Sequence, residues 1–93
     1  MTIGFCRLEL YLPDSGSLKA KRSLLKSMSV RIRNKYNVSV SEVGDNDLWQ
    51  KALLGVAVVS NESRFANQVL SKVVEMVQAE TRIELLDYSL EML

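Results

Sequence analysis

The chain has 93 residues, a formal net charge of +1, 47% hydrophobic and 25% charged residues, no histidine and one cysteine. This composition is typical of a globular protein, and the length predicts one domain over residues 1–93. No apolar run approaches the roughly 20 residues that span a bilayer, the N-terminal residues lack a secretory-signal pattern, and one cysteine forms no internal disulfide, so we expect a cytoplasmic protein.

The first half of the chain predicts a strand, a helix and a second strand. Residues 2–12 alternate in polarity, which is typical of a half-buried strand with its even-numbered residues inward. Turn residues follow, and Ser17 suits the N-cap of a helix over residues 18–35. At about 100° per residue, one arc of this helix is apolar and holds Leu18, Leu24, Leu25, Met28 and Ile32. Residues 37–44 (NVSVSEVG) hold the next predicted strand, with Val38 and Val40 among its apolar residues.

The second half predicts a strand, a helix and a last strand. Residues 50–60 are apolar on both parities, which is typical of a central strand covered on both faces. Asn61 is the expected N-cap of an amphipathic helix that runs through about Ala79. Residues 82–90 form the last predicted strand, which residues 91–93 can extend.

The order strand, helix, strand, strand, helix, strand predicts an α+β fold of the ferredoxin-like kind, the βαββαβ plait. Right-handed crossovers place the two strands of each βαβ half parallel, with one strand between them. We therefore expect a four-stranded antiparallel sheet in the order 4-1-3-2, with both helices on one face.

Four segments resemble the YlxP-like family of small bacterial proteins of uncharacterised function. They are residues 17–22 (SLKAKR), 33–43 (RNKYNVSVSEV), 47–52 (DLWQKA) and 54–57 (LGVA). The resemblance covers essentially the whole chain and implies a ferredoxin-like fold. Genes of the family are often found near those for translation and ribosome-maturation factors, which implies contact with RNA or the ribosome. The family has no established catalytic residues to carry over.

The first predicted helix carries a basic stripe. Four of its cations fall within about 60° of one another on the helical wheel: Lys19, Arg22, Lys26 and Arg33. Arg31 and Lys35 flank the other side of the apolar arc, and residues 17–36 contain no acid that could neutralise these charges. The array is typical of contact with a phosphate backbone, although a solvated polar face gives the same pattern.

Lys21 lies inside the apolar arc of the same helix. Its long side chain can extend past the helix end and join the cationic surface, or it can pair with Glu42 or Asp47 across the edge of the core. We favour a structural ion pair over a catalytic lysine. With Lys21 included, the candidate nucleic-acid-binding residues are Lys19, Lys21, Arg22, Lys26, Arg31, Arg33 and Lys35.

Two helices on one face leave the other face of the sheet open. On this face the third strand presents either Leu53, Ala57 and Val59 or Leu54, Val56 and Val58, and the last strand either Tyr88 and Leu90 or Ile83 and Leu85. An apolar face of this kind indicates self-association, as a homodimer, unless the C-terminal tail and the loop over residues 45–50 cover it. The candidate contact residues are Phe5, Tyr11, Trp49 and Tyr88.

The sequence contains no residues arranged for catalysis. Histidine, the usual general acid–base near neutral pH, is absent, and Cys6 lies on the inward side of the first strand. Asp45 and Asp47 are better explained as turn residues than as ligands of a cation. We therefore expect no enzyme, cofactor, metal or membrane partner. The first hypothesis is a non-catalytic RNA- or ribosome-associated domain, and the alternative is a homo-oligomeric protein-interaction or small-ligand module.

Overall fold

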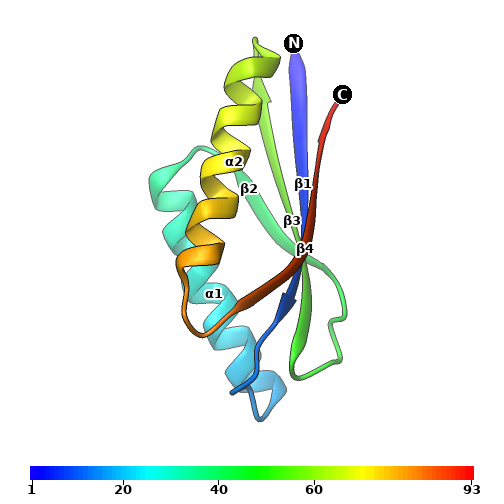
Figure 1. Ribbon diagram of the computed structural model, residues 1–93, viewed down its shortest axis with the longest axis vertical. Helices are drawn as coiled ribbons and strands as arrows, with labels where there is room; N and C mark the ends of the chain where they lie inside the picture. The colour runs from blue at the N-terminus through cyan, green and yellow to red at the C-terminus, as the bar shows by residue number, and fades with distance from the viewer.

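The computed structural model describes residues 1–93 and has six helices and strands in the order βαββαβ (Figure 1). They are β1 (Thr2–Tyr11), α1 (Leu18–Lys35), β2 (Ser39–Gly44), β3 (Lys51–Ser60), α2 (Ser63–Ala79) and β4 (Glu84–Met92). The strands form one antiparallel sheet in the order β2-β3-β1-β4, and both helices cover the same face (Figure 1). The predicted ferredoxin-like fold is confirmed, because this order is 4-1-3-2 counted from the opposite edge.

The two helices begin differently. In α1 the predicted N-cap is confirmed, because the Oγ of Ser17 accepts a hydrogen bond from the Ala20 amide at 3.0 Å. In α2 the prediction that Asn61 is the N-cap is wrong. The N-cap is Glu62, whose side chain makes no cap bond and whose own amide donates to the Oγ of Ser60 at 3.1 Å. Ser60 at the end of β3 thus binds the backbone just before α2, and the N-cap side chain leaves the amides of the first turn uncapped.

The core lies between the sheet and the helices. In β1 the even-numbered residues face the helices, as the alternation predicts. In β3 the same parity is inward, so the residues in the core are Ala52, Leu54, Val56 and Val58. Leu53, Ala57 and Val59 consequently lie on the open face. Cys6 is completely buried, and burial raises the pKa of its thiol to about 11, which makes it a poor nucleophile near neutral pH.

A β-bulge changes the direction of side chains along β4. Glu9 lies opposite Asp87, but the next residue, Leu10, lies opposite Leu85, so β4 has one extra residue. The strand also begins and ends two residues later than residues 82–90, and Leu93 extends the pairing through two backbone hydrogen bonds with Ile3. The predicted extension into residues 91–93 is thus confirmed.

Neither helix is long and apolar enough to cross a membrane.

Candidate nucleic-acid interface and open sheet face

The basic stripe lies on exposed positions of α1. Five of the seven candidate nucleic-acid-binding residues are exposed and take part in none of the four ion pairs of the structure. They are the four cations of the stripe and Lys35, that is Lys19, Arg22, Lys26, Arg33 and Lys35. The first four follow one side of the helix over about 21 Å, at 1.5 Å per residue. The Lys35 ammonium lies 5.8 Å from the centre of the Tyr36 ring. The surface therefore offers a row of charges with no carboxylate partner within the chain.

Arg31 differs from these five, because its guanidinium lies 2.6 Å from a carboxylate oxygen of Glu80, just beyond the end of α2. Glu80 also pairs with Arg82 at 2.8 Å and accepts a bond from the Arg82 amide at 3.1 Å. The Arg82 side chain contributes most to lowering the pKa of Glu80 to about 2, and Arg31 lowers it further. The inclusion of Arg31 among the free cations is therefore wrong, since an acid from a distant segment neutralises it.

Lys21 is completely buried, so its inclusion in the nucleic-acid-binding surface is also wrong. Its ammonium lies 2.8 Å from the Oε2 of Glu42. It also donates to three backbone carbonyls, those of Asp45 at 2.8 Å, Lys51 at 3.2 Å and Asn46 at 3.3 Å. The structure favours the ion-pair alternative, with Glu42 rather than Asp47 as the acid, because only a fixed acceptor set makes a buried ammonium tolerable.

The structure contains no group of three or more histidine, cysteine or acidic side chains close enough to hold a metal ion.

The open face of the sheet is apolar at one end and charged in the middle. At the apolar end, Ile3 and Val59 lie opposite each other on β1 and β3. Next to them the half-buried Phe5 packs beside Val43 above Gly55, where an added Cβ would lie 3.3 Å from Phe5 and 3.1 Å from Val43. A side chain at position 55 would displace this contact, so glycine allows the two apolar groups to meet.

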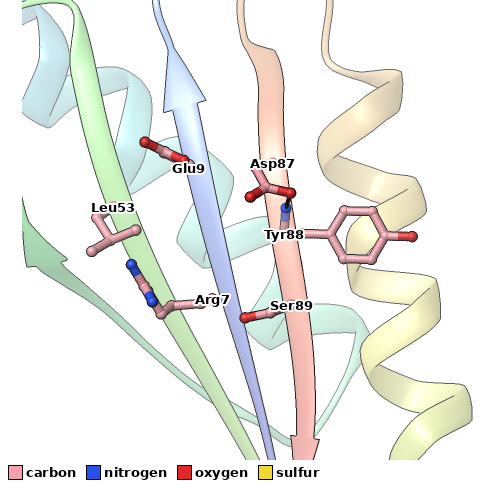
Figure 2. Close-up of a pocket in the computed structure, with 6 residues that line it drawn as sticks. All are labelled: Arg7, Glu9, Leu53, Asp87, Tyr88 and Ser89. Carbon is pink, nitrogen blue, oxygen red and sulfur yellow. Dashed lines mark hydrogen bonds between the residues drawn. The ribbon is translucent and has the colours of Figure 1, made fainter.

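The middle of the open face has a shallow hollow of about 150 Å³ (Figure 2). Its lining residues are Arg7, Glu9, Leu53, Asp87, Tyr88 and Ser89. Arg7 is exposed and belongs to no ion pair, although Glu9 follows it on the same side of β1 and Asp87 lies opposite Glu9. Arg7 is a functional candidate that the sequence did not single out, since neighbouring opposite charges on a strand are expected to pair.

The four predicted self-association residues do not share one face. Phe5 and Tyr11 are half-buried on the open face, and Trp49 is 57% exposed in the loop between β2 and β3. Tyr88 lies opposite Leu8, a residue that faces the helices, and its ring points away from the hollow (Figure 2). The placement of Tyr88 on the open face is wrong. The bulge sets Leu85 opposite Leu10 and Tyr88 opposite Leu8, so residues of both alternative sets of β4 face the helix side.

These features define a small ferredoxin-like α+β protein with a cationic helix on one side and an open sheet face on the other. The chain belongs to the family described as a protein of unknown function, DUF503, whose model matches residues 3–90. It is similar to the uncharacterized protein YlxP of Bacillus subtilis (strain 168), with 40% identity over 82 residues, which cover 88% of this chain and 89% of that protein. The resemblance seen in the sequence motifs is confirmed.

Proposed function

We propose that this protein is a non-catalytic RNA-binding domain that contacts the phosphate backbone through the exposed cations of α1. One observation carries the proposal: Lys19, Arg22, Lys26 and Arg33 form a continuous row with no acid beside them in residues 17–36 and no ion pair elsewhere. Phosphate binding releases condensed counterions, and this favours an array of cations that the protein leaves unneutralised.

The proposed contact recognises backbone and shape rather than base sequence. Domains that read single-stranded RNA on the face of such a sheet use exposed aromatic side chains on the two central strands. Here β3 contains no aromatic residue, and the Phe5 and Tyr11 rings of β1 are half-buried. Base stacking on the sheet is therefore poorly supported, whereas helix α1 has the charges for phosphate contacts.

A pair of matched charge reversals tests the proposal. K26E/R33E changes two cations of the row, and R64E/K72E changes two exposed cations of α2, so both variants carry the same net charge. Binding of a labelled RNA fragment is measured by fluorescence anisotropy at low salt. We expect K26E/R33E to abolish measurable binding and R64E/K72E to retain most of it. Equal losses in the two variants would mean that only net charge matters, and no loss in K26E/R33E would remove α1 from the contact.

The ribosome is the RNA-containing partner that we propose for this surface. Cosedimentation of the protein with ribosomal particles from cell extract at low salt supports this source, provided that K26E/R33E stays in the supernatant. If the protein binds naked RNA but never sediments with the particles, the ribosome is the wrong source while the phosphate contact stands.

We propose homodimerisation through the open sheet face as a second function. The favouring observation is the exposed apolar end of this face, where Ile3 is 36%, Val59 68% and Leu93 72% exposed. Apolar groups gathered in this way are typical of a surface that is covered in the working assembly. Light scattering measures the mass of the protein with and without RNA, and a monomer mass at all concentrations would exclude this function without affecting the first.

A further inference from the structure

We propose that two copies pack open face against open face, with their β1 strands antiparallel, so that Arg7 of each copy pairs with Glu9 of the other. The two-fold axis runs between the two sheets, level with Leu8 of β1. This inference rests on the proposed homodimerisation and specifies its geometry.

The first argument is the unpaired charge in the middle of the open face. Arg7 and Glu9 stand on the same side of β1, and Asp87 lies beside Glu9 on β4 (Figure 2). None of the three belongs to an ion pair within the chain. The centre of the face thus holds one cation and one acid of β1, Arg7 and Glu9, that have no ion-pair partner within the chain. Asp87 adds a second acid, whose Oδ1 accepts a hydrogen bond from the Tyr88 amide at 2.9 Å.

The second argument is symmetry. The two-fold axis lies between the two stacked sheets and runs perpendicular to the strands. It brings each residue of β1 opposite the residue of the other copy that lies equally far from Leu8 in the other direction. Arg7 then meets Glu9 twice, once on each side of the axis, and Phe5 meets Tyr11. A patch that joins two copies by a two-fold axis has to be complementary to itself, and the residues of β1 satisfy that condition in this register. Stacked sheets lie about 10 Å apart, a gap that an arginine and a glutamate reach across from opposite sides.

The third argument is the match between the two ends of the face. The apolar end carries Ile3 and Val59, and the opposite end continues into the loop with Leu48 and Trp49, which are 48% and 57% exposed. The Leu12 amide donates to the Gln50 carbonyl at 2.8 Å and so holds this loop beside the end of β1. In Figure 1 the loop lies at the lower end of the sheet, to the right of the strands, whereas the helices lie to the left. The two-fold axis places the apolar end of each copy against the Trp49 loop of the other.

The size of the face is sufficient for a weak dimer. Four strands about 4.8 Å apart and up to about 30 Å long give a face on the order of 500 Å² in each copy. The total of about 1,000 Å² is at the lower limit for a specific interface, so we expect dissociation in the roughly micromolar range. In this register Glu84 of each copy faces Glu91 of the other along β4. These acids lie at the exposed rim, where solvent and salt screen their repulsion, and they weaken the dimer rather than hold it.

The geometry also connects the two proposed functions. The dimer has both helix layers on its outer sides, so the cations of α1 remain exposed in each copy. A dimer with two such surfaces binds a long or folded RNA more tightly than a monomer does, because the first contact raises the effective concentration of RNA at the second surface.

Charge reversal tests the register. In R7E each contact between copies joins two carboxylates, and in E9R each joins two guanidinium groups, so both variants should dissociate at least tenfold more readily than the wild type. In an equimolar mixture of R7E and E9R, every contact between unlike copies joins opposite charges, and dimerisation should return. R64E and E75R, which reverse exposed charges on α2, are the matched controls and should dimerise like the wild type. Sedimentation equilibrium measures the dissociation constant of each sample.

Trp49 gives an independent readout, because it is the one tryptophan of the chain. Its emission should move to shorter wavelength as the wild type dimerises and remain unmoved in R7E alone. Recovery of the mixed sample supports the proposed register. If R7E and E9R dissociate but their mixture does not recover, the register is overturned while homodimerisation stands. If the wild type dimerises and R7E and E9R dimerise equally well, the interface lies elsewhere. If the wild type remains monomeric, the register and homodimerisation are overturned together.

Discussion

The ammonium of Lys21 lies 2.8 Å from the Oε2 of Glu42, and the Lys21 side chain is completely buried. The same ammonium donates to carbonyls at both ends of the loop between β2 and β3, those of Asp45 and Lys51. One side chain of α1 therefore holds the strand β2 and the loop that carries Trp49. The cation that the sequence placed within the apolar arc thus has a structural role, unlike the exposed cations of the same helix.

Replacing Lys21 should be costly. K21M removes the ammonium and leaves the Glu42 carboxylate and three carbonyls without their donor, so we expect the free energy of unfolding to fall by about 3–5 kcal/mol. Urea denaturation measures the loss. K19M, which removes an exposed cation two residues earlier, should change the value by less than about 0.5 kcal/mol. Similar losses in both variants would show that the buried ion pair does not hold the loop.

Asp45 is the one residue other than glycine with a positive φ, at 59°. This left-handed conformation is tolerated by aspartate and free of strain for glycine, but it is poor for a β-branched side chain. We expect D45G to keep or slightly raise the stability and D45V to lower it by about 1–2 kcal/mol. Thermal denaturation compares the two, and an equal effect of both substitutions would argue that the turn relaxes to another conformation.

Glu80 should make the stability depend on pH in the acid range. Its pKa is about 2 in the folded protein and 4.5 in its ordinary state, so the unfolded chain takes up the proton first as the pH falls. The stabilisation is present above pH 4.5 and is lost as the pH falls toward 2. The difference in unfolding free energy between the wild type and E80Q should therefore shrink over this window. In an R82A background the shrinkage should be smaller, because the main partner of Glu80 is gone, and an unchanged pH dependence there would contradict the assignment.

RNA binding by α1 should weaken steeply with salt. Four phosphate contacts predict a slope of about −3 in a plot of the logarithm of the association constant against that of salt concentration for single-stranded RNA. K26A should reduce the steepness by about 0.7, and K72A on α2 should leave it unchanged. Anisotropy titrations between about 50 and 200 mM salt measure the slope. A shallow slope in the wild type would indicate that few phosphates are contacted.

Much of the fold could be predicted from the sequence because local signals agreed with one another. Helix α1 begins and ends at the predicted residues, since Ser17 caps it and an apolar arc runs along its length. Strand β3 is central as expected, because it is apolar on both parities. Its inward parity could not be assigned from the sequence for the same reason, and only the pairing with β1 fixes which residues face the helices.

The surface was harder to predict because it depends on contacts between distant segments. The extra residue in β4 leaves no composition signal, yet it places Leu85 and Tyr88, which differ in parity, on the same side of the sheet. The neutralisation of Arg31 by Glu80 joins residues 49 positions apart, and only the packing of α1 against α2 brings them together. An acid directly after a helix and two residues before an arginine is a weak sign of such a junction.

The contact between α1 and RNA is tested most directly by NMR, with an RNA fragment titrated into the isotope-labelled protein at low salt. We predict that the amide shifts concentrate on residues 19–35 of α1, with little change at Arg7 and Phe5 on the open face. Shifts that concentrate on β1 and β3 and spare α1 would contradict the proposed RNA contact through the basic helix.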